Sequence, residues 1–241
     1  NLLAAVCGRV CPQETQCEGV CVVGESLEPV AIGRLERWVG DQAIKEKWAN
    51  VPYVEPSGFK VGIVGSGPAG MACAADLAKA GCEVTVYEAF HQAGGVLKYG
   101  IPDFRLPNAV VDAEIENLRK LGVKFECNTL VGRLFTIEQM RDELGFDAVF
   151  IGTGAWDPVS IGLDGEKSAV FGLEFLANVQ RGIKKALGKK VLVIGGGNAA
   201  IDVAISSLRL GAEEATMACL EKREEMPALP WEIEQAEEEN I

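Results

Sequence analysis

Two glycine-rich turns have the residue types and the spacing that could hold the phosphates of a dinucleotide. In such a turn, the first glycine permits a tight bend, the second lets the backbone approach a pyrophosphate, and a third small residue lets helix and strand pack closely. A helix that begins there also directs free N–H groups and a positive dipole end toward the phosphates. The sequence therefore predicts two dinucleotide sites, one at Gly65, Ser66, Gly67, Pro68 and Ala69 and one at Gly195, Gly196, Gly197, Asn198, Ala199 and Ala200.

One carboxylate stands where a ribose would lie in the first of these sites. Glu88 ends the apolar run that follows the first turn, 23 residues after Gly65. A carboxylate at this position can accept hydrogen bonds from both hydroxyls of an adenosine ribose. We interpret the first turn as the site of a permanently held flavin, FAD, and the second as the site of a nicotinamide nucleotide that binds and leaves.

Small residues in two later segments leave room for a flat ligand against the backbone. The segment 89–107 contains the pair Gly94 and Gly95, and residues 152–154 end another apolar run. Without the neighbouring turn, the first segment would read as a glycine-rich surface loop. We expect these segments to frame the flavin ring. The candidate contacts are Ala89, Gly95, Val96, Leu97, Gly100, Ile101 and Arg105 of the first segment, Gly152, Thr153 and Gly154 of the second, and Val131 between them.

Four cysteines near the start of the chain have the donor chemistry of a metal site. Their spacing, C-x3-C-x5-C-x3-C over residues 7–21, matches neither paired zinc knuckles nor the bacterial ferredoxin run. The density of thiols, with Pro12 after Cys11, favours iron–sulfur ligation, and zinc is the alternative. Because His91 is the only histidine, a mixed cysteine and histidine zinc site is disfavoured. On pattern alone, Glu36 is a solvated acid.

Strands and helices must position these residues, and the hydrophobic periodicity predicts both. Apolar runs predict buried strands, and segments with a repeating apolar face or with capping residues predict helices. Asn108 and Gly122 would bound one helix, and Thr136 with Gln139 would form a capping box. The predicted strands are 61–64, 84–87, 123–127, 147–151, 190–194 and 215–220; the predicted helices are 33–49, 71–80, 108–121, 136–144, 170–187, 198–210 and 231–240, with a linker over 50–58.

Composition and length limit the class of protein. The 241 residues carry a net charge of −12 and are 48% apolar, which argues against a nucleic-acid or anionic-membrane partner. No membrane-length apolar run or signal peptide is evident, so a cytoplasmic protein is expected. The predicted fold is α/β, with a helical iron–sulfur segment (1–55), an FAD-binding domain (56–155) and an NAD(P)H-binding domain (156–241). This last domain is expected to be incomplete, because a doubly wound domain needs about three more strands.

Several motifs together resemble one group of flavoproteins. The matching segments cover almost the whole chain and are VCGRVCPQETQCEGVC, EPVAIGRLERW, VGIVGSGPAG, GGVLKYGIPDFRLP, FDAVFIGTGA, VIGGGNAAIDVAISSLRLGA and KREEMPA. They resemble the small (beta) subunit of NAD(P)H-dependent glutamate synthase. They are equally similar to the large subunit of NADH-dependent ferredoxin:NADP oxidoreductase, to sulfide dehydrogenase and to the N-terminal half of dihydropyrimidine dehydrogenase.

This resemblance implies an electron-input subunit. NAD(P)H would give a hydride to FAD, and 4Fe-4S clusters would pass electrons to a larger redox partner subunit. By the resemblance, Cys11 and Cys17 are ligands of one cluster, with Glu36 as its non-cysteine ligand. Cys21 would be a ligand of a second cluster, and Cys7 matches no ligand position. The remaining ligands lie upstream in the family, so both ligand sets are expected to be incomplete here. Because hydride transfer needs no acid–base side chain in principle, we assign no catalytic residue.

One departure from the family bears on the nucleotide. Where the family often has arginines that bind the 2′-phosphate of NADPH, this sequence has Glu221, followed by Lys222 and Arg223. A carboxylate there accepts a hydrogen bond from a 2′-hydroxyl and repels a 2′-phosphate. The sequence therefore favours NAD(H) over NADP(H). Lys222 and Arg223 keep NADPH possible, as does a Glu221 that points to solvent.

Three other functions compete with this interpretation. The first is an electron-bifurcating or hydrogenase-linked NAD(P)H:ferredoxin oxidoreductase subunit, which these residues do not distinguish from the first interpretation. The second is an electron relay that no longer binds nicotinamide, against which the intact GGGNAA turn argues. The third is a zinc-stabilised regulatory module. A disulfide reductase is disfavoured because Cys73 and Cys82 do not form a CxxC pair.

Overall fold

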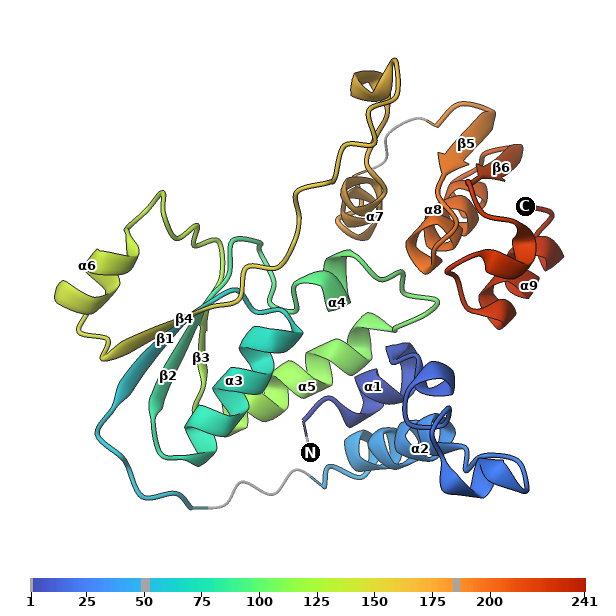
Figure 1. Cartoon of the computed structure of the whole chain (residues 1–241). Coiled ribbons are helices and arrows are strands. Elements are labelled where there is room, and N and C mark those ends of the chain that lie inside the picture. Colours follow the sequence, from blue (N-terminus) through green and yellow to red (C-terminus); the bar gives the residue numbers. More distant parts are fainter. Residues whose placement is uncertain (1, 49–52, 184–186) are drawn as a thin grey trace. The chain divides into compact units, whose positions relative to one another are not determined.

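Both predicted glycine turns follow directly after parallel strands (Figure 1). The computed structural model describes residues 2–48, 53–183 and 187–241. Contacts divide the chain into two compact units, one of residues 1–98 with 103–154 and the other of residues 99–102 with 155–241. The alternation of parallel strands with helices confirms the predicted α/β class.

The first unit is built on a four-stranded parallel sheet with the order β3-β2-β1-β4. The central strand β1 pairs with β2 on one side and with β4 on the other. Its last residue, Val64, lies opposite Tyr87 of β2 and Ile151 of β4, so the carboxyl ends of three strands meet at one edge. The strands are β1 (Lys60–Val64), β2 (Glu83–Tyr87), β3 (Lys124–Glu126) and β4 (Ala148–Ile151).

Helices cover both faces of the central strand. On one face, Ile63 is buried toward α3 (Pro68–Lys79), which contacts β1, β2 and β4. On the other face, Val64 packs in one cluster with Met140 of α6 (Ile137–Asp142). A Cβ at Gly62 would lie 2.6 Å from the Met140 Cε, so glycine at this strand position lets α6 approach the sheet. The strand is thus apolar on both faces, as expected for a parallel sheet.

Helix caps in the first unit agree with the sequence at one helix and differ at another. Thr136 and Gln139 form the predicted capping box of α6, with Thr136 Oγ1 accepting from Gln139 N at 3.2 Å. The prediction that Asn108 caps α5 (Asn108–Lys120) is wrong, because Pro107 is the N-cap residue. Asp103 Oδ1 accepts the Asn108 N–H at 2.8 Å, so an acceptor from the preceding loop replaces the expected one. The short helix α4 spans Val96–Tyr99.

The cysteine-bearing segment folds as two helices that cross closely. α1 (Ala4–Val10) and α2 (Ile32–Lys45) are joined by the 3₁₀ helices η1 (Gln13–Thr15) and η2 (Val22–Glu25). A Cβ at Gly8 would overlap the Arg37 backbone, and a Cβ at Gly40 would overlap the Ala5 backbone. Glycine on each helix therefore permits the crossing. α2 ends at Lys45, four residues before the predicted end at residue 49. Residue 49 and residues 50–52 of the predicted linker lie outside the described residues.

Glu114 of α5 contacts the backbone at the start of α1 and gives a pH-dependent prediction. Its buried carboxylate accepts hydrogen bonds from the backbone N–H groups of Leu3 and Ala5. Burial nevertheless raises its pKa above the ordinary value near 4.5. The folded state therefore binds this proton more tightly than the unfolded state, so the contribution of Glu114 to stability falls as the pH rises through its folded pKa.

We expect Glu114→Gln to remove this pH dependence, because an amide oxygen still accepts both hydrogen bonds without a charge. Relative to the wild type, the variant should gain unfolding free energy between pH 4 and pH 7.5, measured by urea unfolding. Glu116→Gln makes the same charge change at an exposed site of the same helix and should show no such gain. A variant that loses stability relative to the wild type as the pH rises would contradict the assignment.

The second unit contains a parallel pair, β5 (Lys190–Ile194) and β6 (Glu214–Ala218), with α8 (Asn198–Arg209) packed on both strands. Val193, Ala204 and Ala215 form its buried centre. Its other helices are α7 (Gly172–Gln180), α9 (Pro230–Glu238) and the 3₁₀ helices η3 (Glu166–Ser168) and η4 (Arg223–Glu225). α7 is shorter than predicted, and residues 184–186 of that predicted helix lie outside the described residues.

Across the described residues, every helix is too short or too polar to cross a lipid bilayer.

Candidate cofactor-binding sites

Three glycines of the first turn have different structural reasons to be glycine. Gly65 has a φ of +101°, and a Cβ there would overlap the Gly152 carbonyl oxygen. A Cβ at Gly70 would overlap the Gly65 carbonyl oxygen. A Cβ at Gly67, by contrast, would have no neighbour within 4 Å. The fold therefore requires glycine at the first and third positions, and the open space at Gly67 is where a ligand could approach the backbone.

The N-terminus of α3 offers hydrogen-bond donors at the same place. Gly67 is the N-cap residue, Pro68 begins the helix, and no side chain caps it. Pro68 has no N–H, which suits the first helical position. The N–H groups of Ala69 and Gly70 belong to the first turn and lack partners within the helix. This end of a helix of 12 residues can bind an anion such as a pyrophosphate.

Glu88 is fixed beside this turn by hydrogen bonds to both of its carboxylate oxygens. It follows β2 and is 5% exposed. Its Oε2 accepts from Ser66 N at 3.1 Å and from Ser66 Oγ, and its Oε1 accepts from Phe90 N at 2.9 Å. Ser66 Oγ in turn accepts from Gly94 N at 2.9 Å. The carboxylate is therefore held in one orientation at the carboxyl end of the sheet. The spacing of the motif indicated Glu88 but not the roles of Phe90 and Gly94.

The loop after β2 lies partly against the turn. A Cβ at Gly95 would lie 2.7 Å from the Gly67 Cα, so this glycine packs directly on the turn. Leu97 is buried and Ala89 is exposed. Gly100 and Ile101 belong to the second compact unit, where Ile101 O accepts from Gln180 Nε2 at 2.7 Å. The predicted flavin loop is thus divided between the two units.

The other predicted flavin contacts belong to the first unit, and all but Arg105 are placed by contacts at the end of its sheet. Gly152 N donates to Val64 O at 2.8 Å, which brings residues 152–154 against the turn. Val131 packs in the cluster around Val64 and Met140. Arg105 is half-buried, with its guanidinium 5.6 Å from the centre of the Phe104 ring.

The second turn repeats the geometry of the first in the second unit. Gly195 has a φ of +142°, and a Cβ there would lie 3.3 Å from the Ala200 Cβ. Gly197 is the N-cap residue of α8, and the nearest atom to a Cβ there would be Pro227 Cγ at 3.9 Å. Gly197, which corresponds to Gly67 of the first turn, is therefore again the open position. Asn198 and Ala199, which begin α8, supply the N-terminal backbone of this site.

The segment after β6 closes over this second turn. Glu221 Oε2 lies 3.4 Å from the position of a Cβ at Gly196, so its carboxylate lies beside the turn. Ala228 N donates to Gly196 O at 3.1 Å, and Leu229 N donates to Asn198 Oδ1 at 3.1 Å. The contact with Asn198 was not evident from the sequence, because 31 residues separate the two.

The predicted cluster ligands lie at the end of α1, in the segment that joins α1 to α2, and on α2 itself. Cys11 is the C-cap residue of α1, and Cys17 is exposed in the turn that follows η1. Burial, then Cys11 and Glu36, raise the pKa of the Cys7 thiol to about 11, so Cys7 lies within electrostatic reach of both. All eight cysteines are free. The thiols suit an iron–sulfur cluster in kind, but no three His, Cys, Asp or Glu residues within the described ranges are grouped so that they could hold a metal ion.

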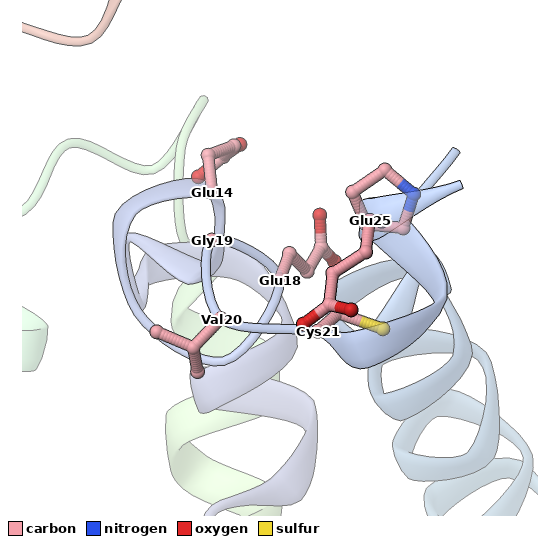
Figure 2. Close-up of a pocket in the computed structure, with 8 residues that line it drawn as sticks. Glu14, Glu18, Gly19, Val20, Cys21 and Glu25 are labelled. Carbon is pink, nitrogen blue, oxygen red and sulfur yellow. The ribbon is translucent and has the colours of Figure 1, made fainter. Parts of the chain in front are cut away.

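An open cavity of about 450 Å³ lies beside Cys21 (Figure 2). Backbone N–H groups of Val30, Val23 and Gly24 lower the pKa of the Cys21 thiol. Carboxylates rather than basic groups line this cavity, which suits a cation or a metal more than an anion. The lining residues are Glu14, Glu18, Gly19, Val20, Cys21, Gly24, Glu25 and Pro29.

Comparison with protein-family models matches both parts of the chain. Residues 59–241 match the pyridine nucleotide-disulphide oxidoreductase family, and residues 1–48 match the dihydropyrimidine dehydrogenase domain II, 4Fe-4S cluster family. The solved structure of FprA from Mycobacterium tuberculosis in complex with NADPH aligns with a TM-score of 0.64 at 21% identity, over 76% of this chain and 48% of FprA. This likeness shows the fold.

Curated relatives include the small chains named in the sequence resemblance. The glutamate synthase (NADPH) small chain of Escherichia coli is 36% identical over 100% of this chain and 54% of its own length. A putative glutamate synthase (NADPH) small chain of Cereibacter sphaeroides is 38% identical over 98% of this chain and 60% of its own. The beta subunit of an NADP(+)-dependent formate dehydrogenase of Moorella thermoacetica is 38% identical over 99% of this chain and 37% of its own.

The chain therefore spans about half the length of the glutamate synthase small chains that it matches, and the predicted resemblance is confirmed. With two glycine turns after parallel strands, an N-terminal segment of the 4Fe-4S type and a family match over residues 59–241, this chain belongs to the pyridine nucleotide-disulphide oxidoreductase family.

Proposed function

We propose that this protein is an NAD(P)H-oxidising FAD flavoprotein subunit that delivers electrons to a larger redox partner, as its resemblance to glutamate synthase small chains implies. The main support for this proposal is the open space beside Gly67 in the first turn and beside Gly197 in the second. Packing requires Gly65 and Gly70, whereas Gly67 has open space where a side chain would stand, and Gly197 has only one contact at van der Waals distance. A turn used for folding alone has no need of glycine at these open positions.

The residues of the first site would bind and orient FAD, which supplies the hydride acceptor when bound. The backbone N–H groups of Ala69 and Gly70 would donate to the pyrophosphate at the start of α3. Glu88, held by Ser66 and Phe90, would accept the hydroxyls of the adenosine ribose. Gly95 and the segment 152–154 would border the rest of the cofactor. We assign none of these residues a proton-transfer role, because hydride transfer does not require one.

The second site would hold the nicotinamide nucleotide, and we propose that it prefers NADH. Asn198 and Ala199 would meet the pyrophosphate at the start of α8. Glu221 stands beside Gly196, where a carboxylate accepts a ribose 2′-hydroxyl and repels a 2′-phosphate. The relatives named above are NADPH or NADP(+) proteins by name, so this preference would distinguish the chain from them.

The N-terminal segment would connect the flavoprotein to its partner. We propose Cys11, Cys17 and Glu36 as ligands of one 4Fe-4S cluster and Cys21 as a ligand of another. The family match over residues 1–48 supports this assignment. The partner is a larger redox subunit. A bifurcating or formate-dehydrogenase-type partner is the second candidate, favoured by the similarity to a formate dehydrogenase beta subunit.

An anaerobic titration of the full-length flavoprotein tests this proposal. We expect NADH to bleach the visible flavin absorbance at a lower concentration than NADPH. Glu221→Gln should raise the relative effectiveness of NADPH about tenfold, since it removes one charge repulsion of about 1.4 kcal/mol. Bleaching by NADPH at the lower concentration in the wild type would overturn the assignment of Glu221. Absence of bleaching by either nucleotide, with flavin present, would overturn the proposed enzyme.

A further inference from the structure

Arg223 follows Glu221 by two residues in the sequence, and its guanidinium is bound to a glutamate. Arg223 Nε and Nη2 donate to Glu237 Oε1 and Oε2 at 2.6 and 2.7 Å. Arg223 begins η4, two residues after Glu221, and Glu237 lies on α9. This bidentate ion pair occupies the Nε and Nη2 edge of the guanidinium. Arginine binds phosphates through the same type of bidentate contact.

Further carboxylates surround this ion pair. Glu237 raises the pKa of Arg223 most, and Glu224 and Glu234 raise it too, so all three carboxylates lie within electrostatic reach of the guanidinium. The positive charge of Arg223 is therefore more than balanced by its neighbours. A 2′-phosphate that approached Arg223 would meet this excess of negative charge as well as Glu221.

We propose that Glu237 is a specificity-determining residue of the nucleotide site: it occupies one phosphate-binding edge of Arg223 and so makes the site select a dinucleotide with a free 2′-hydroxyl. This inference rests on the proposed function of the second turn. It adds to Glu221 a second determinant that touches no part of the nucleotide and acts through Arg223. Exchange of this one carboxylate would free a guanidinium two residues after Glu221.

The ion pair can be removed without unfolding the unit. The Arg223 and Glu237 side chains are 53% and 50% exposed, and exposed ion pairs contribute little to stability. Glu238 is the next residue of the same helix, is exposed, and is not among the groups that shift the pKa of Arg223. Glu237→Gln and Glu238→Gln thus change the net charge equally, and only the first breaks the contact with Arg223.

Binding of two nucleotide fragments to the full-length protein tests the inference without requiring electron transfer. ADP-ribose and its 2′-phosphorylated form are titrated by calorimetry at one fixed ionic strength. We expect Glu237→Gln to raise the affinity for the phosphorylated form about tenfold and to leave that for ADP-ribose unchanged, since a freed charged hydrogen bond is worth at least this factor. Glu238→Gln should bind both fragments as the wild type does.

A third variant shows whether the effect passes through Arg223. In Glu237→Gln combined with Arg223→Gln, the gain for the phosphorylated fragment should disappear. An unchanged ratio of affinities in Glu237→Gln, or an equal change in Glu238→Gln, would overturn the inference while ADP-ribose binding still supports the proposed site. Failure of every variant and the wild type to bind either fragment would overturn both.

Discussion

Replacement of Gly67 by valine is expected to abolish FAD binding and to leave the fold intact. A Cβ at this position has no neighbour within 4 Å, and the backbone there, with φ −67° and ψ −178°, is one that any residue adopts. The side chain would instead occupy the space through which a pyrophosphate reaches the start of α3. Loss of two charge-assisted hydrogen bonds, each worth about 1.5–3 kcal/mol, predicts an affinity for FAD at least about 100-fold lower.

The measurements are flavin content after purification, flavin affinity of the apoprotein, and the free energy of unfolding of the apoprotein. Gly67→Val should change that free energy by no more than about 0.5 kcal/mol. Gly70→Ala is the matched control, because its Cβ would overlap the Gly65 carbonyl oxygen. It should lose both flavin and about 1–3 kcal/mol of stability. A Gly67→Val protein that retains FAD, or that unfolds as Gly70→Ala does, would contradict the assigned site.

Replacement of Gly197 by alanine is expected to leave FAD bound and to prevent its reduction by nicotinamide nucleotides. Alanine is the suitable residue here because the Pro227 Cγ lies 3.9 Å from the Cβ position, which is an ordinary contact. The new methyl group would stand where the nucleotide pyrophosphate approaches α8. We expect the nucleotide concentration needed for half-maximal flavin bleaching to rise at least about 100-fold, by the same hydrogen-bond argument.

Gly197→Ala distinguishes the function of the second turn from that of the first. Its visible flavin spectrum and its reduction by dithionite should match those of the wild type, which shows that the flavin is present and reducible. Gly195→Ala is the control for folding, since Gly195 has a φ of +142° that alanine does not adopt without strain. Wild-type bleaching by NADH in Gly197→Ala would show that the nucleotide binds elsewhere.

Features set by local sequence were predictable, and features set by packing between distant segments were not. The strands, the turns and the position of Glu88 follow from periodicity and from fixed spacing along the chain. The capping box of Thr136 and Gln139 was also predictable, because its partners are three residues apart. The cap of α5 was not, since Asp103 reaches Asn108 from a preceding loop.

The candidate sites show the same division. Glycine spacing located both turns, but it did not indicate that Ser66 ties Glu88 to Gly94, because this network depends on how the loop after β2 folds back. The pairing of Arg223 with Glu237 joins residues that lie 14 positions apart on two different elements. From the sequence alone, Arg223 would be free to bind a phosphate, whereas in the structure its guanidinium is paired with Glu237.

Hydride transfer to this flavoprotein is tested most directly by single-turnover reduction of the full-length protein, mixed anaerobically with NADH or with NADH deuterated at the nicotinamide C4 position. We predict that flavin absorbance bleaches in one phase with NADH and more slowly with the deuterated nucleotide, because hydride transfer breaks the C–H bond at the nicotinamide C4. Flavin that stays oxidised with either nucleotide would contradict the claim that this chain forms the hydride-accepting part of an NAD(P)H-oxidising enzyme.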